Sequence, residues 1–240
     1  MTLAPQPCSR REALARLGSF FGTAVAAPTL SGLITSPARA HGAGDYVESA
    51  LPYDWSALEG FLSADALHAH YETYQRTHIR EANRLLHEIS RTRSAGDFSR
   101  ANALAESLAF HASGHLLHNL YWRSVSPHAS ANPSGDVQHH VEENFGSPEA
   151  LRDHLRAAAA QLDGDGWVII AMDTTIGRLF VLPIESNHRL ALLGAVPLMA
   201  LDLWEHAYTP DYGHRRNDYV EKFVQRLDWD YLGLQIVRNH

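Results

Sequence analysis

The sequence predicts an α+β fold, in which an N-terminal antiparallel helical hairpin is followed by an α/β domain with a small three-stranded antiparallel sheet. Helical spacing of apolar residues dominates the first half of the chain, whereas short β-branched runs begin only at Trp167. Hydrophobic residues make up 45% of the 240 residues, which is enough for a packed core. We therefore expect a folded protein and not a disordered chain.

The hairpin is predicted from two long amphipathic segments. Residues 63–89 carry apolar and aromatic side chains at helical spacing with no Gly or Pro among them. Ser63 can cap the start of this helix, and Asp65 lies in its first turn, where the helix dipole favours negative charge. A second helical pattern covers residues 99–122, and Gly96 marks the turn between the two helices.

The second half of the chain is predicted to be mixed α/β. We expect a helix at residues 148–162, followed by a β-hairpin whose strands cover 167–172 and 179–184. A third strand at 195–203 and a further helix at 217–227 should follow. Pro197 cannot donate a hydrogen bond to a neighbouring strand, so the third strand should lie at an edge or begin near this residue.

The first 40 residues have the features of an export signal. Arg10 and Arg11 precede an apolar, small-residue stretch at 17–34, and the Ala-x-Ala motif at 38–40 is typical of a signal-peptidase site. We predict a twin-arginine-type signal peptide at 1–40, a helical hairpin domain at 41–130, an α/β domain at 131–240, and export to the bacterial periplasm. An ordinary secretory signal is the alternative route. Because Pro28 breaks the apolar stretch, no stable membrane anchor is expected.

Charge and cysteine content narrow the possible functions. Twenty Lys and Arg against 27 Asp and Glu give a net charge of −7, and no basic block is present, so we expect no nucleic-acid partner. The single cysteine, Cys8, lies in the predicted signal peptide. The exported part therefore has neither disulfides nor a cysteine nucleophile, and any metal must be bound through nitrogen and oxygen.

Histidines gather on the inner faces of the two predicted hairpin helices. His70, Tyr74 and His78 are four residues apart and share a helix face, and His118 lies on the second helix. A buried imidazole is more often a hydrogen-bonded core residue than a metal ligand, so the helical spacing alone decides little.

A carboxylate and an imidazole follow the third predicted strand. The Asp202-x-x-x-His206 spacing allows both side chains to reach one ion, although the bare motif also arises by chance among sixteen His. Imidazoles combined with one carboxylate suit iron, manganese or zinc, whereas calcium and magnesium prefer oxygen ligands.

Four ordered segments of the chain resemble the iron/manganese superoxide dismutases. They are Leu51-Pro52-Tyr53, the string His118-Asn119-Leu120-Tyr121-Trp122, the string from Leu201 to Tyr208 that reads LDLWEHAY, and the region from Arg215 to Asp230. The resemblance spans nearly the whole chain after the predicted signal peptide.

The resemblance implies a metal site and a reaction. His70, His118, Asp202 and His206 would hold one iron or manganese ion per subunit, between the hairpin and the α/β domain. The implied activity is the disproportionation of superoxide to dioxygen and hydrogen peroxide. Glu205 would hydrogen-bond the ligand His206 of a second subunit, which implies a homodimer.

The sequence departs from the family pattern close to the implied metal. Family members carry His at the position of Tyr74 and Tyr at that of His78, so the two candidate catalytic residues are exchanged. The group that contacts the metal-bound solvent is also ambiguous. Gly114 resembles the pattern of the subgroup that takes this group from the later hairpin. There Asn187 and His188 are adjacent candidates, and His188 is slightly favoured.

Two alternative functions follow from these departures. One is a dismutase-like periplasmic metal-binding protein with weak or redirected activity, which the exchange of Tyr74 and His78 favours. The other is a zinc hydrolase on a helical scaffold, which would need a carboxylate as general base, and the sequence marks none.

Overall fold

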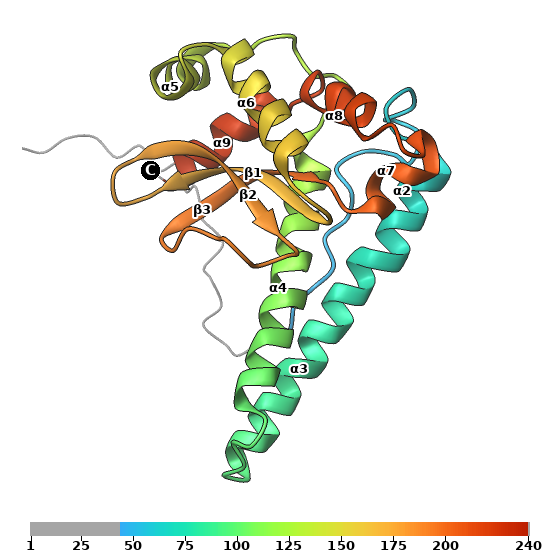
Figure 1. The fold of residues 1–240 in the computed structure, drawn as a ribbon, viewed down its shortest axis with the longest axis vertical. Helices are drawn as coiled ribbons and strands as arrows, with labels where there is room; N and C mark the ends of the chain where they lie inside the picture. Colours follow the sequence, from blue (N-terminus) through green and yellow to red (C-terminus); the bar gives the residue numbers. More distant parts are fainter. Residues whose placement is uncertain (1–43, 240) are drawn as a thin grey trace, which may run out of the picture. The chain divides into compact units, whose positions relative to one another are not determined.

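The structure, a computed structural model, describes residues 44–239, and the predicted signal peptide lies outside the described residues. Helices α2 (Ala64–His70), α3 (Arg76–Ser94) and α4 (Ala101–Ser124) come first, and α5 (Gly135–Phe145) and α6 (Pro148–Gln161) follow. Three strands come next, β1 (Gly166–Asp173), β2 (Arg178–Glu185) and β3 (Ala195–Asp202). The described part ends with α7 (Glu205–Tyr212), α8 (Arg216–Val224) and α9 (Trp229–Asn239) (Figure 1).

The helical hairpin consists of α2 and α3, which form one continuous helical run, packed against α4 (Figure 1). Ser63 caps the first helix by accepting a hydrogen bond from the backbone N–H of Ala66. A π-helical segment, Tyr71–Gln75, joins α2 to α3, and the N–H of Arg76 donates to the carbonyl of Tyr71, five residues earlier. The helix thus widens directly after His70, which sequence periodicity did not predict.

The chain before the hairpin is tied to α3 by a pair of hydrogen bonds. The backbone N–H of Tyr46 donates to Oδ1 of Asn83, and Nδ2 of Asn83 donates to the carbonyl of Tyr46, at 2.7 and 2.9 Å. The Tyr71 hydroxyl donates to the carbonyl of Ser49 at 2.7 Å. These contacts fix residues 46–49 alongside the first helical run.

The sheet has three antiparallel strands in the order β2-β1-β3, as predicted. The central strand β1 is buried along nearly its whole length, whereas β2 and β3 form the edges. Each edge strand contains a proline, Pro183 in β2 and Pro197 in β3. The β1–β3 register shifts between Ile170 and Ala171, next to the pairing of Ala171 with Pro197, so the predicted edge position of the third strand is confirmed.

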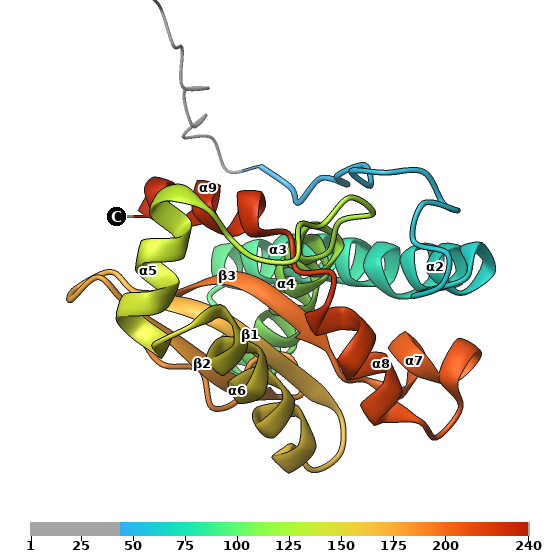
Figure 2. The ribbon, with the colours of Figure 1, turned by 90° about the horizontal axis from the view of Figure 1, so that it is seen from above.

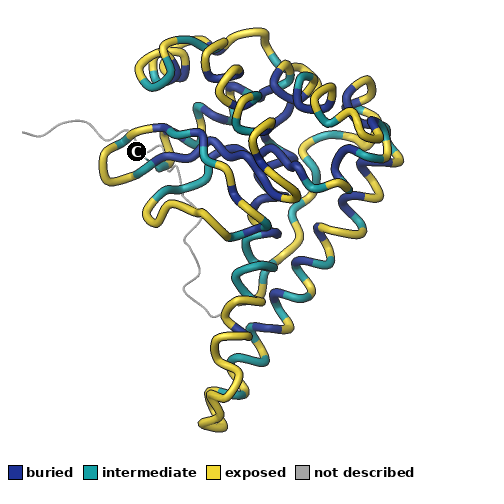
Figure 3. The backbone as a smooth tube through the Cα atoms, in the orientation of Figure 1, coloured by how far each residue is buried: buried dark blue, intermediate teal, exposed yellow. Residues whose placement is uncertain are grey.

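One hydrophobic core joins the hairpin to the sheet. Helix α4 packs on β3, while α6 packs on β1 and β2, and Figure 2 shows α6 on the side of the sheet away from α3 and α4. Buried side chains are concentrated in β1, β3 and the half of α4 nearest the sheet, whereas the far end of the hairpin is largely exposed (Figure 3). The rigid part of the fold therefore surrounds the point where α4 meets β3.

The observed elements extend the sequence-based prediction at three places. Helix α5 forms in a segment for which no helix was predicted, and α7 and α9 were not predicted as separate helices. Among the described residues, none of the helices combines the length and apolar character needed to cross a bilayer.

Candidate metal centre

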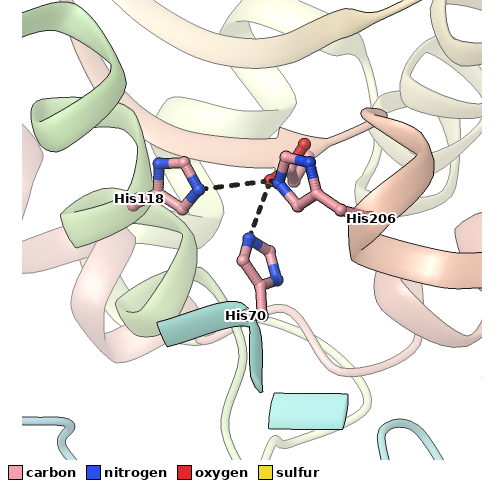
Figure 4. Close-up of side chains that lie close together, drawn as sticks. His70, His118 and His206 are labelled. Atoms are coloured by element: carbon pink, nitrogen blue, oxygen red, sulfur yellow. Dashed lines mark ion pairs between the residues drawn. The ribbon is translucent and has the colours of Figure 1, made fainter. Parts of the chain in front are cut away.

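Four side chains from separate parts of the chain meet where the hairpin contacts the end of the sheet (Figure 4). His70 ends α2, His118 lies on the buried side of α4, Asp202 ends β3, and His206 lies in the first turn of α7. Their candidate ligand atoms all lie within 4.8 Å of one another. The structure thus brings together all four residues that the family resemblance implied.

The spacing of these atoms fits a shared metal ion better than direct hydrogen bonds. Oδ2 of Asp202 lies 3.2, 3.7 and 3.5 Å from Nε2 of His70, His118 and His206. All four atoms are buried, yet none has a hydrogen-bond partner among the described residues. Buried polar atoms left unpaired are costly. Ligands about 2.0–2.2 Å from a first-row ion such as zinc lie roughly 3–3.7 Å from each other, which matches the three distances from Asp202.

The unused atoms of two ligands are held by the backbone. Nδ1 of His118 donates to the carbonyl of Gly114 at 2.6 Å, which leaves the lone pair of Nε2 free to bind a metal. Oδ1 of Asp202 accepts from the backbone N–H of Trp204 at 2.9 Å, so Oδ2 is the oxygen that remains available. The chain therefore orients these donor atoms in advance.

The site keeps its donors in the protonation states that metal binding requires. Burial lowers the pKa of His70, against the opposing effect of Asp202. Burial also holds the pKa of His118 well below its usual range. Burial alone would raise the pKa of Asp202, but the surrounding imidazoles, led by His206, lower it instead. Two neutral imidazoles and an anionic carboxylate are thus presented to an ion.

Aromatic rings surround the four ligands. The edge of Trp122 contacts His70 with 4.8 Å between ring centroids, and Trp167 contacts His118 at 5.0 Å. The indoles of Trp122 and Trp167 are almost completely buried. These rings exclude water and so strengthen electrostatic interactions at the site.

A cavity of about 250 Å³ opens beside the ligands His118 and His206, and Tyr74 and His78 both line it. Tyr74 is partly exposed and stacks on His206, with 3.7 Å between centroids and an interplanar angle of 10°. His78 is buried, and its ring centroid lies 5.3 Å from that of His118. Burial, followed by the neighbouring His111, lowers the pKa of His78 to about 4.

The structure separates the two candidates Asn187 and His188. Asn187 lines the cavity beside the ligands, accepts from Nε1 of Trp167 at 2.9 Å and donates to the carbonyl of Phe110 at 3.2 Å. His188 lines a different, mostly apolar cavity between α4 and the sheet. We therefore favour Asn187 over His188 as the polar group near the metal.

Gly114 provides the space for this arrangement. A Cβ atom on Gly114 would lie 2.5 Å from Cε1 of His78 and 2.8 Å from Nδ2 of Asn187. Because residue 114 has no side chain, His78 and Asn187 can both pack closely against α4, the helix that carries the ligand His118.

Glu205 and two further residues complete the description of the site. Glu205 is exposed at the start of α7, next to the ligand His206. His111 lines the cavity, and its Nδ1 lies 3.2 Å from Nδ1 of His78. Gln75 was missed by sequence analysis, although its spacing from the buried His78, Ala82 and Leu85 marks it as an inward-facing polar residue.

A larger cavity, about 660 Å³, lies elsewhere, between residues 59–63 and α7 and α8. The candidate ligands do not line it. The smaller cavity, which His118 and His206 line, is the one that adjoins the candidate metal site.

Comparison with known families matches both halves of the chain. The family model described as iron/manganese superoxide dismutases, alpha-hairpin domain, matches residues 45–126. The model of the C-terminal domain of the same enzymes matches residues 133–234. Together the two matches cover most of the chain and include all four candidate ligands.

Individual relatives agree with this result. The chain is 33% identical over 180 residues to a superoxide dismutase [Mn] of Haloarcula marismortui, covering 75% of this chain and 88% of the relative. It is 31% identical over 192 residues to a superoxide dismutase [Mn/Fe] of Propionibacterium freudenreichii, covering 79% of this chain and 96% of the relative. It is 32% identical over 186 residues to a probable superoxide dismutase [Fe] of Bacillus subtilis, covering 78% of this chain and 66% of the relative.

Proposed function

Since this chain belongs to the iron/manganese superoxide dismutase family, we propose that it removes superoxide outside the cytoplasm, as an exported homodimer. The chain is a superoxide dismutase of the iron/manganese type, with its metal at His70, His118, Asp202 and His206. One observation carries this conclusion. The four buried, unpaired donor atoms converge within 4.8 Å in a chain whose two halves both match the family.

A bound iron or manganese ion supplies the one-electron chemistry, in which one superoxide is oxidised to dioxygen and a second is reduced, with two protons, to hydrogen peroxide. The protein's own contribution is to hold and tune the ion. Three imidazoles and one carboxylate form its binding site, and the buried negative charge of Asp202 stabilises a cationic ion in a water-poor environment.

The cavity beside the ligands is the route by which the substrate would approach. We assign to His78, Tyr74 and Asn187 the polar contacts that orient superoxide there, because all three line this cavity. His78 occupies the place at which the family pattern has Tyr, and an imidazole nitrogen can donate or accept a hydrogen bond as a phenol does. The exchanged pair thus still offers one imidazole and one hydroxyl to the cavity.

Export and dimerisation are supported by sequence features. The signal-like residues 1–40 support export by the twin-arginine route, which carries folded, metal-loaded proteins. The exposed position of Glu205 beside His206 supports a two-fold contact in which Glu205 of one subunit meets His206 of the other. Sedimentation of the metal-loaded protein tests the second point, and a monomer at micromolar concentration would contradict it.

Metal analysis joined to a superoxide-consumption assay tests the function. Protein purified from its exported form should contain iron or manganese and consume superoxide rapidly. The Asp202→Ala variant should lose both the metal and the activity, because it removes the only carboxylate of the site.

Two results would contradict the proposal. Bound iron or manganese without superoxide consumption would favour the dismutase-like metal-binding protein with redirected activity. Zinc as the only bound metal would favour a hydrolytic function.

Glu143→Ala is the control for the loss of one negative charge in Asp202→Ala, because it removes an exposed acid on α5.

A further inference from the structure

Gln75 is a fully buried polar side chain that the reaction does not use. It ends the π-helical segment Tyr71–Gln75, five residues after the ligand His70, and none of its surface is exposed. Its Oε1 has no hydrogen-bond partner among the described residues. An apolar residue of similar size would avoid this desolvation cost, so packing alone does not explain a carboxamide here.

The nitrogen of Gln75 reaches across the hairpin to α4. Nε2 donates to Oδ1 of Asn119 at 2.9 Å and lies 3.3 Å from Nδ1 of His115. Nδ2 of Asn119 in turn lies 3.2 Å from Nε2 of His115. Three polar side chains therefore close a triangle between the two helical runs, which we call the cross-helix brace.

The cross-helix brace lies at the same level as two metal ligands. Asn119 directly follows His118 in α4, and Gln75 lies one π-turn beyond His70. The brace is also covered from outside, since the ring of Tyr46 packs edge-on against His115 at 5.4 Å. The hydrogen bond from Gln75 to Asn119 therefore joins the end of the widened turn directly to α4.

We propose that Gln75 is a positioning residue, which through the cross-helix brace holds the π-helical turn against α4 and so sets the separation of His70 and His118. The proposal rests on the metal site being the functional site. His118 is already oriented within its own helix by Gly114. The brace thus acts on the spacing between the helices and not on the rotation of a single ring.

The Gln75→Leu variant tests the proposal, because it keeps the volume and removes the hydrogen bonds. In the full-length chain we expect the dissociation constant for manganese(II) to rise roughly 10-fold or more, as for other residues that support metal ligands. The visible absorption of the metal-loaded protein should also shift, because the ligand geometry changes. Asn119→Ala removes the brace from α4 and should reproduce both effects, including in the case that Gln75→Leu does not fold.

Asn144→Leu is the matched control. Asn144 lies on α5, is partly buried as Asn119 is, and makes two hydrogen bonds away from the brace: its Oδ1 accepts from the backbone N–H of Leu179, and its Nδ2 donates to the carbonyl of His140. This variant should lower the melting temperature without changing manganese affinity or absorption.

Wild-type manganese affinity and absorption in Gln75→Leu and Asn119→Ala would overturn the proposal. An equal change in Asn144→Leu would also overturn it, because the effect would then be one of general stability. Neither result would affect the assignment of the metal site, which the Asp202→Ala variant tests separately.

Discussion

Gly114→Ala should disturb the active site by adding a single carbon atom. The new Cβ would lie 2.5 and 2.6 Å from Cε1 and Nδ1 of His78, and 2.8 Å from Nδ2 of Asn187. Non-bonded carbon atoms prefer about 3.5–4.0 Å, so the imidazole has to move by about 1 Å. Both neighbours are buried, and the space open to them is the cavity beside the metal ligands, so any movement into it changes the site.

The expected effect on stability is small and the expected effect on activity is large. Overpacking costs about 1–3 kcal/mol, whereas replacing a helical Gly with Ala gains about 1 kcal/mol. The net loss of unfolding free energy should therefore be about 0–2 kcal/mol. A displacement of about 1 Å in catalytic geometry can reduce rates by about 10²-fold, and we expect a loss of kcat/KM approaching that size.

Stopped-flow measurement of superoxide decay, together with thermal unfolding and metal content, checks this prediction. Gly233→Ala is the matched control, since Gly233 is also helical and its Cβ would meet only Val137, at 3.3 Å. This control should keep full activity. If Gly114→Ala retains wild-type kcat/KM with a full metal complement, the tight packing of His78 and Asn187 against α4 does not matter for the reaction.

Three further predictions concern the cavity, pH and export. Asn187→Ala should lower superoxide turnover roughly 10- to 100-fold, while His188→Ala leaves it essentially unchanged; equal losses in both would contradict the assignment. The pKa of His78 is lower in the folded state than in the unfolded state. Its stabilisation of the folded protein is therefore complete above about pH 6.5, and it is lost as the pH falls towards about 4, because the unfolded chain binds the proton first. In urea unfolding of metal-free protein this loss should amount to about 3 kcal/mol and disappear in His78→Phe. Replacing Arg10 and Arg11 by Lys should retain the precursor in the cytoplasm, as measured by fractionation, and unchanged export would indicate the ordinary secretory route.

The long-range layout of the fold could be predicted from the sequence because its periodicities are strong. The hairpin and the three strands follow apolar patterns that continue over many residues. Helix α5 was missed because only Val137 and Val141 of its residues are buried, and because Gly135 and the preceding prolines indicate a loop. Short, mostly exposed helices depend on packing that a sequence pattern does not contain.

The metal ligands were found through ordered motifs, whereas the finer features of the site depend on backbone conformation. The π-helical turn at Tyr71–Gln75 changes which residues face α4 without changing the apolar pattern. Asn187 and His188 could not be distinguished because Ser186, just before them, has a φ of 56°. This left-handed residue interrupts the alternation of the strand, so the side-chain directions beyond it cannot be extrapolated.

The two edge prolines have a consequence for how copies of this protein can associate. Pro183 and Pro197 each remove an amide hydrogen from an outer strand, and the bulge beside Pro197 bends that strand further. A strand from another molecule would therefore meet an interrupted row of backbone N–H donors at either edge of the sheet. Growth into continuous intermolecular β-sheets is therefore disfavoured.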